Sequence, residues 1–175
     1  MKILVIQQRY GIGDMVIFSP YFHAIFKKHQ NSITLLAKKS SKAEELFLED
    51  DSIEEIISLE KNMDGLKGFF TLARILDKKN FDKVYIFNGS LRYKILAHYL
   101  KIKSVFHYPL FTSKDIIYQT AKIFTENCIN QTVSTIPNLK IKTETIMSAK
   151  KSYNFDDEFN HIVLGISASG PTKRW

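Results

Sequence analysis

The sequence contains one cysteine in 175 residues and no long apolar run. Since a disulfide needs two cysteines, Cys128 excludes an internal one, which agrees with a reducing compartment. A membrane-spanning helix needs roughly 20 apolar residues in succession, and no segment approaches that length. The N-terminal stretch MKILVIQQ is also too short for a secretory signal. We therefore expect a cytoplasmic protein.

The chain also lacks clustered metal ligands and blocks of like charge. Its five histidines are scattered, with no cysteine or aspartate at ligand spacing, so we expect no metal site. The net charge of +7 favours an anionic partner: nucleic acid, a phosphorylated small molecule or an acidic membrane surface. An ordinary lysine-rich solvated surface is the alternative. Charge alone supports nucleic acid, because no signature of a nucleic-acid-binding module is present, and we expect no such partner.

Short β-branched runs alternate with stretches of helical periodicity along the first two thirds of the chain. This pattern predicts βαβ units, and hence a Rossmann-like α/β fold: a parallel sheet with helices on both faces. The predicted strands are 2–6, 32–37, 53–59, 81–87 and 104–108, with 53–59 near an edge. The predicted helices are one that ends near residue 29, then 42–50, 64–78 and 90–101. Helix 64–78 rests on the spacing of Leu66, Phe69, Phe70, Ala73 and Leu76.

The pattern loosens beyond Pro109. Residues 113–127 are a candidate helix, and the segment that follows is typical of connecting structure with one further helix. Residues 161–167, HIVLGIS, predict a fresh strand eight residues before the chain stops.

The loop after the first predicted strand reads RYGIGD, which suggests a nucleotide-binding turn. A dinucleotide fingerprint needs a third glycine where this chain has Val16, and an acid after the second strand where it has Ala37-Lys38-Lys39. A P-loop is excluded because no Gly-Lys-Ser/Thr follows. The loop therefore does not predict an NAD site.

The glycine turn instead places Asp14 near a helix start. Its structural interpretation is an N-cap, worth about 1 kcal/mol. Its functional interpretation is a general base, because ligands bind beyond the carboxyl ends of strands in open α/β sheets. Ser19-Pro20 is also a helix-start signature, so the helix either begins there or begins at Asp14 and kinks at Pro20.

The chain ends in GISASGPTKRW, where small hydroxyl residues and glycine precede lysine and arginine. Backbone N–H groups and hydroxyls donate hydrogen bonds to phosphate oxygens, and lysine adds positive charge, so this ending suits a phosphate. A flexible basic terminus is the alternative.

Three segments in this order resemble the ADP-heptose:lipopolysaccharide heptosyltransferases and their wider glycosyltransferase family 9. They are RYGIGDMVIFSPYFHAIFKKH, FDKVYIFNGSLRYKILAHYLKIKSVFHY and IVLGISASGPTKRW. The resemblance implies a GT-B fold, in which two Rossmann-like domains face each other. Residues 1–155 would then be the N-terminal, acceptor-side domain, and 156–175 the first strand and phosphate loop of a truncated donor domain.

The resemblance also implies roles for particular residues. Asp14 would be the general base that takes the proton of the acceptor hydroxyl. Ser90 is equally placed to be the N-cap of its helix, which is the structural interpretation we favour. The residues implied to bind the donor phosphates are Ser167, Ser169, Thr172 and Lys173. Those implied on the acceptor side are Arg9, Gly11, Gly13, Asn88, Ser90 and Arg92.

The implied activity is inverting, metal-independent transfer of a sugar, with no cofactor beyond an ADP-linked nucleotide-sugar co-substrate. ADP-heptose is the expected donor, and a lipopolysaccharide-type or other lipid-linked glycan is the expected acceptor, at the inner face of the membrane. The basic surface would then meet anionic headgroups. The alternative is a non-catalytic acceptor-binding half, or a remnant, that pairs with a separate donor-domain chain.

Overall fold

The computed structural model describes residues 1–60, 63, 65–109, 116–155 and 158–162. Residues Met1–Lys140 form one compact unit, and a second unit begins at Ile141. The predicted strand 161–167 falls almost wholly outside the described residues.

The first unit is built on a five-stranded sheet in the order β3-β2-β1-β4-β5. Every neighbouring pair in it is parallel, which confirms the predicted architecture, and β3 lies at an edge as expected. The strands are β1 (Ile3–Gln7), β2 (Ile33–Lys38), β3 (Ile53–Leu59), β4 (Lys83–Ile86) and β5 (Ser104–His107).

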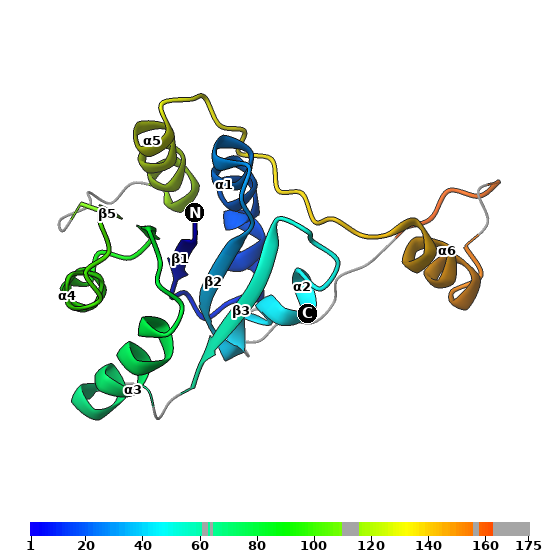
Figure 1. The fold of residues 1–175 in the computed structure, drawn as a ribbon. Coiled ribbons are helices and arrows are strands. Elements are labelled where there is room, and N and C mark those ends of the chain that lie inside the picture. The colour runs from blue at the N-terminus through cyan, green and yellow to red at the C-terminus, as the bar shows by residue number, and fades with distance from the viewer. Residues whose placement is uncertain (61–62, 64, 110–115, 156–157, 163–175) are drawn as a thin grey trace. The chain divides into compact units, whose positions relative to one another are not determined.

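Helices cover both faces of this sheet, because the side chains of the central strand alternate between two apolar clusters. Ile3 and Val5 enter one cluster, whereas Leu4 and Ile6 enter the other. Figure 1 shows α1 and α5 on one face and α3 and α4 on the other. The helices are α1 (Ile12–His29), η1 (Lys39–Ser41), α2 (Ala43–Leu46), α3 (Gly65–Asp77), α4 (Leu91–Tyr99) and α5 (Ile117–Ile129).

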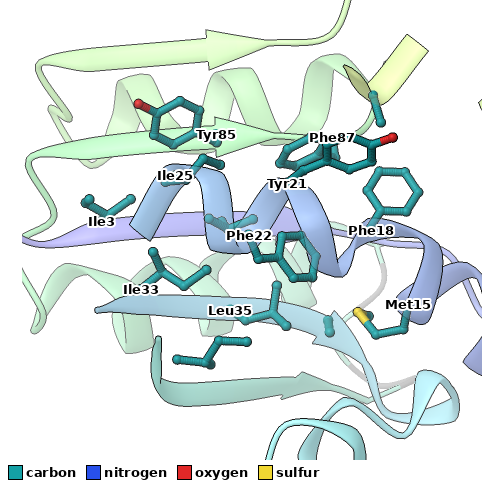
Figure 2. Close-up of a cluster of buried hydrophobic side chains, with 14 of the residues drawn as sticks. Ile3, Met15, Phe18, Tyr21, Phe22, Ile25, Ile33, Leu35, Tyr85 and Phe87 are labelled. Atoms are coloured by element: carbon teal, nitrogen blue, oxygen red, sulfur yellow. The ribbon is translucent and has the colours of Figure 1, made fainter. Parts of the chain in front are cut away.

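The core on the α1 face is largely aromatic, and Figure 2 shows its rings gathered between α1 and the strands. The ring of Phe87, just beyond β4, lies edge-on to Phe18 at 5.4 Å and to Phe124 of α5 at 5.1 Å between centroids. Such pairs add about 0.5–1.5 kcal/mol each beyond the burial of their area. They fix α1 and α5 over the carboxyl half of the sheet.

Helix α1 begins at Ile12 and continues through Pro20, so a start at Ser19 is wrong. Proline has no N–H, which removes the usual donor to the carbonyl of Val16 four residues earlier. The buried Ser19 hydroxyl donates to that carbonyl at 2.8 Å and accepts from the backbone N–H of Asn138 at 3.3 Å. One hydroxyl therefore compensates for the proline and ties the α1 face to the end of the first unit.

Helix α3 confirms the predicted helix 64–78 but not all of its buried face. Ala73 and Leu76 are buried as expected, and so is Leu72, whereas Phe70 is 58% exposed. The helical spacing predicted that Phe70 belongs to the buried face. The face of α3 that packs on the sheet is narrower than predicted and leaves Phe70 out. Phe70 lies at its border, against Phe69 at 5.5 Å.

In the second unit, α6 (Thr143–Ser152) is the further helix expected there, and it has no buried residue.

In the first unit, the candidate helix 113–127 is observed as α5, which begins at Ile117 and ends two residues later than expected. Within the described part of the chain, no helix is both long enough and apolar enough to cross a bilayer.

The Ser19 hydrogen bonds give a first stability prediction. Ser19→Ala leaves the buried Val16 carbonyl and the Asn138 N–H without their partner. We expect the free energy of unfolding to fall by about 1–3 kcal/mol, measured by urea denaturation. Ser32→Ala, which removes an exposed hydroxyl, is the control, and equal stability of the two variants would contradict the bridging role.

Asp50 is a buried acid whose carboxylate has several hydrogen-bond partners. Its Oδ1 accepts from the Ser52 N–H at 3.0 Å and the Ser52 hydroxyl at 2.6 Å, and its Oδ2 meets His23 Nε2 at 2.5 Å. Burial alone would raise the pKa of Asp50, but the hydrogen bonds from His23 and Ser52 outweigh it and lower the pKa well below its usual value. The ionised form is thus stabilised by folding.

Because the pKa of Asp50 is lower in the folded than in the unfolded protein, its ionised carboxylate stabilises the fold at pH values above the unfolded pKa. This stabilisation is lost as the pH falls through the pKa of the folded state. We therefore expect Asp50→Asn to lower the free energy of unfolding by about 1–3 kcal/mol at neutral pH. The difference from wild type should shrink steadily as the pH falls below about 4. Urea denaturation across this range measures it, with the exposed neighbour Asp51→Asn as control. A difference that stays constant with pH would refute the assignment.

Candidate functional site

The carboxyl ends of the strands meet at one edge of the sheet. The chain builds β1, β2 and β3 outward in one direction, then crosses back to place β4 and β5 on the other side of β1. The strand order therefore reverses between β1 and β4, and this switch point is where open α/β sheets bind ligands. Both predicted acceptor-side segments, 9–14 after β1 and 88–92 after β4, follow the strands that flank it.

Asp14 is the third residue of α1, and Gly11 occupies the N-cap position without a side-chain cap. The N-cap interpretation of Asp14 is therefore wrong. Its carboxylate turns back over the loop, since a Cβ added at Gly11 would lie 3.2 Å from Asp14 Oδ2. The side chain is half-buried, and no hydrogen bond or ion pair joins it to another described residue. The carboxylate oxygens therefore have acceptor positions that no described residue occupies.

Two buried glutamines that sequence reasoning missed follow directly along β1. Gln7 Oε1 accepts from the Arg9 N–H at 2.9 Å, and Gln8 Oε1 accepts from the Tyr93 hydroxyl at 2.6 Å. The Nε2 group of each is buried and has no partner among the described residues. Burying an amide donor without a partner costs about 1–3 kcal/mol, so such groups need an explanation. Donors held ready for a ligand are one.

A third such group is Tyr108, which follows β5. Its hydroxyl is buried and has no hydrogen-bond partner in the described part of the chain. Burial raises the pKa of Tyr108 far above its ordinary value, while the charge of Arg9 opposes that rise. The hydroxyl therefore stays protonated and can donate. Gln7, Gln8 and Tyr108 belong to no recognisable sequence motif. The only signal that could have indicated them is the run of polar residues after an apolar strand.

The residues after β4 form hydrogen bonds that fix their own loop and the start of α4. Asn88 Oδ1 accepts from the Ser90 N–H at 2.7 Å, and Ser90 Oγ accepts from the Arg92 N–H at 3.3 Å as the N-cap of α4. The capping interpretation of Ser90 is thus confirmed. The Arg92 guanidinium donates to the Met63 carbonyl at 2.6 Å, which joins α4 to the connection before α3.

Positive charge flanks the edge. Arg9 is exposed, and the Nζ of Lys38, at the end of β2, lies 5.2 Å from the ring centre of the exposed Tyr10. A Cβ added at Gly13 would meet nothing within 4 Å, so the backbone there is open to an approaching ligand. Anionic ligands are therefore favoured here.

The residues predicted to bind donor phosphates, Ser167, Ser169, Thr172 and Lys173, lie outside the described residues. Among the residues that are described, no cluster of histidine, cysteine and acidic side chains could hold a metal ion.

No protein-family model and no curated protein matches this sequence, but solved structures do. A glycosyl transferase family 9 structure from Veillonella parvula aligns with a TM-score of 0.72 and 19% identity, covering 99% of this chain and 56% of that one. The E. coli ADP-heptose lps heptosyltransferase II aligns with a TM-score of 0.63 and 17% identity, covering 90% and 52%. The E. coli heptosyltransferase WaaC with ADP-2-deoxy-2-fluoro heptose gives 0.54 and 10%, covering 78% and 50%.

These likenesses establish the fold: a Rossmann-like α/β sheet of the kind found in family 9 glycosyltransferase structures. They confirm the resemblance that the sequence motifs indicated. The chain spans about half the length of the structures it matches.

Gly13 provides a test of ligand approach at this edge. Gly13→Ala adds a methyl group in open space within the first turn of α1, so the free energy of unfolding should stay level or rise by about 0.5 kcal/mol. The probe is a deacylated lipopolysaccharide oligosaccharide, the kind of acceptor that the sequence resemblance implies. If a ligand of this kind binds at this edge, we expect its binding, measured by calorimetry, to weaken about tenfold, because a desolvating contact to the backbone is blocked. The control is Ala149→Gly on α6. Unchanged binding by Gly13→Ala would remove Gly13 from the site.

Proposed function

We propose that this chain is the acceptor-side part of a glycosyltransferase that transfers a sugar from a nucleotide sugar to a glycan. The observation that carries this proposal is the Asp14 carboxylate, half-buried and without a described partner, at the switch point of the sheet. The fold shared with family 9 glycosyltransferase structures supports it.

In the proposed reaction, Asp14 accepts the proton of an acceptor hydroxyl as that oxygen attacks the anomeric carbon of the donor sugar. The bond from the anomeric carbon to the phosphate oxygen breaks, and the nucleoside diphosphate leaves with the electron pair. Attack opposite the leaving group inverts the anomeric centre. A carboxylate oxygen suits this role because it can accept a proton, and those of Asp14 are not engaged by any described residue.

The buried donors at the ends of β1 and β5 would orient the acceptor. Gln7 Nε2, Gln8 Nε2 and the Tyr108 hydroxyl can each donate to a sugar oxygen, and a sugar bound there would satisfy groups that are costly to leave unpaired. Arg9 and Lys38 would meet acidic substituents of the glycan, such as phosphates or carboxylates. A lipopolysaccharide-type acceptor has both features.

ADP-heptose is the donor to test first, because two of the similar structures are named for heptose transfer. In this proposal the hydroxyls of Ser167, Ser169 and Thr172 and the ammonium of Lys173 contact the donor pyrophosphate. Their hydrogen bonds and charge would stabilise the leaving diphosphate without a bound metal.

Asp14→Asn tests the proposed base. It preserves size and the turn over Gly11 but removes the basic oxygen, so we expect the transfer rate to fall by roughly 10²–10⁴-fold. Release of ADP from ADP-heptose in the presence of the oligosaccharide acceptor measures the rate, and calorimetry measures acceptor binding, which should change little. The matched control is Asp77→Asn, an exposed acid at the end of α3.

A wild-type rate for Asp14→Asn would contradict the assignment of the base. If the wild-type chain binds the acceptor but releases no ADP, the acceptor site stands and catalysis requires a donor-binding chain in addition.

A further inference from the structure

Helices α3 and α4 expose a contiguous group of large apolar side chains, which we name the α3–α4 surface. Its members are each more than half exposed: Phe70, Leu91, Ile95 and Tyr99. The Tyr99 ring lies 6.1 Å from Phe69 and 6.5 Å from Phe70, so the two helices share one aromatic cluster. Single exposed apolar residues are normal, but a contiguous apolar patch marks an interaction site.

A pocket of about 510 Å³ opens within this surface. Gly65, Phe69 and Phe70 of α3 and Arg92 and Ile95 of α4 line it, and its walls are almost entirely apolar. A peptide backbone entering such a pocket would lose its hydrogen bonds to water without replacement, whereas a hydrocarbon chain needs none. The chemistry of the pocket therefore favours a lipid over a polypeptide.

The segment of sequence that carries this surface is predominantly basic. Residues 65–103 contain two acidic side chains, Asp77 and Asp82, against nine basic ones: Lys67, Arg74, Lys78, Lys79, Lys83, Arg92, Lys94, Lys101 and Lys103. Residues 44–60, by contrast, contain eight acidic side chains and no lysine or arginine. Residues 65–103, which include α3 and α4, are therefore strongly basic, whereas residues 44–60 are acidic.

Three of these cations lie beside the apolar group. Lys67 and Arg74 are three residues before and four residues after Phe70, so they share its side of α3, and Lys94 is three residues after Leu91 on α4. All three are exposed, and none forms an ion pair in the described part of the chain. Long basic side chains can extend to headgroups while their stems cover apolar surface.

We propose that the α3–α4 surface docks on an anionic lipid bilayer. An apolar centre bordered by unpaired cations matches the layered chemistry of such a membrane, in which anionic headgroups lie over acyl chains. Phe70, Ile95 and Tyr99 insert at the level of the headgroups, and Lys67, Arg74 and Lys94 contact lipid phosphates.

The surface also adjoins the candidate site. Helices α3 and α4 begin at Gly65 and Leu91, just after the carboxyl ends of β3 and β4, so the pocket opens close to the edge that holds Asn88 and Ser90. If the proposed function is right, docking presents that edge to a lipid-linked acceptor. The docking itself does not depend on sugar transfer.

The test is sedimentation of the 175-residue chain with lipid vesicles, in the absence of any sugar nucleotide. We expect binding to vesicles of equimolar phosphatidylcholine and phosphatidylglycerol, and none to phosphatidylcholine alone. Phe70→Ser should weaken binding at least about tenfold, since one aromatic side chain no longer leaves water. Lys67→Ala with Arg74→Ala should weaken it about 25-fold, at about fivefold per cation, and high salt should abolish it.

Matched controls lie elsewhere on the chain. Leu48→Ala removes an apolar side chain that is 81% exposed, and Lys27→Ala with Lys28→Ala removes two exposed cations from the end of α1 on the opposite face of the sheet. Both should bind vesicles like wild type. Circular dichroism checks that each variant is folded, and Tyr99→Ser replaces Phe70→Ser if the latter is not.

Three results would overturn the proposal. Wild-type binding by the Phe70 and Lys67/Arg74 variants would place the contact elsewhere. Equal losses of vesicle binding in the control variants would show that binding depends on the net charge of the protein and not on this surface. Self-association in analytical ultracentrifugation that Phe70→Ser abolishes, without vesicle binding, would assign the surface to a second copy of the chain. Since no sugar is present, none of these results bears on the proposed transfer reaction.

Discussion

Strand β1 is hydrogen-bonded on both sides and buried on both faces, and the functional geometry depends on where it ends. Its alternating apolar side chains hold the two layers of helices, so its backbone has little freedom. Gln7 and Gln8 lie at the end of this strand, at the switch point, and both are buried. Their amide Nε2 groups have no hydrogen-bond partner among the described residues. Asp14 lies in the first turn of α1, and the aromatic cluster around Phe87 holds this helix against the sheet. The end of β1 and the start of α1 are therefore positioned by the core, as the orientation of an acceptor hydroxyl in the proposed reaction would require.

Much of the fold could be predicted from the sequence because parallel sheets leave strong local patterns. Each strand is a short apolar run, and the turns and helices between them are spaced as βαβ units require. The errors occurred where tertiary contacts decide. A start of α1 at Ser19 was allowed by propensity, but the Ser19 hydroxyl compensates for Pro20 inside the helix. Phe70 fitted the helical spacing of the core face, yet it lies on the exposed border of α3, next to Tyr99 of another helix. Local sequence predicts neither the hydrogen bond that compensates for a proline inside a helix nor the width of the helix face that packs on the sheet.

The candidate site was predictable only in part, for a related reason. Glycine and aspartate in the first loop form a recognisable motif, and the structure places that loop and the 88–92 segment after strands that are neighbours in the sheet. Gln7, Gln8 and Tyr108 have no motif, because what distinguishes them is burial without a partner, a property of the folded chain. Ser90 and Asn88 show the opposite case: residue types suited to sugar binding that cap and brace α4.

The proposed function requires that the amide donors of Gln7 and Gln8 at the end of β1, which have no partner among the described residues, bind a glycan. The most direct measurement is the side-chain amide NMR spectrum of the 175-residue chain during titration with a deacylated lipopolysaccharide oligosaccharide. We expect the Nε2 resonances of Gln7 and Gln8 to shift together and to saturate, while that of the exposed Gln131 does not move. Saturating shifts elsewhere, with the Gln7 and Gln8 amides unmoved, would contradict the proposed function.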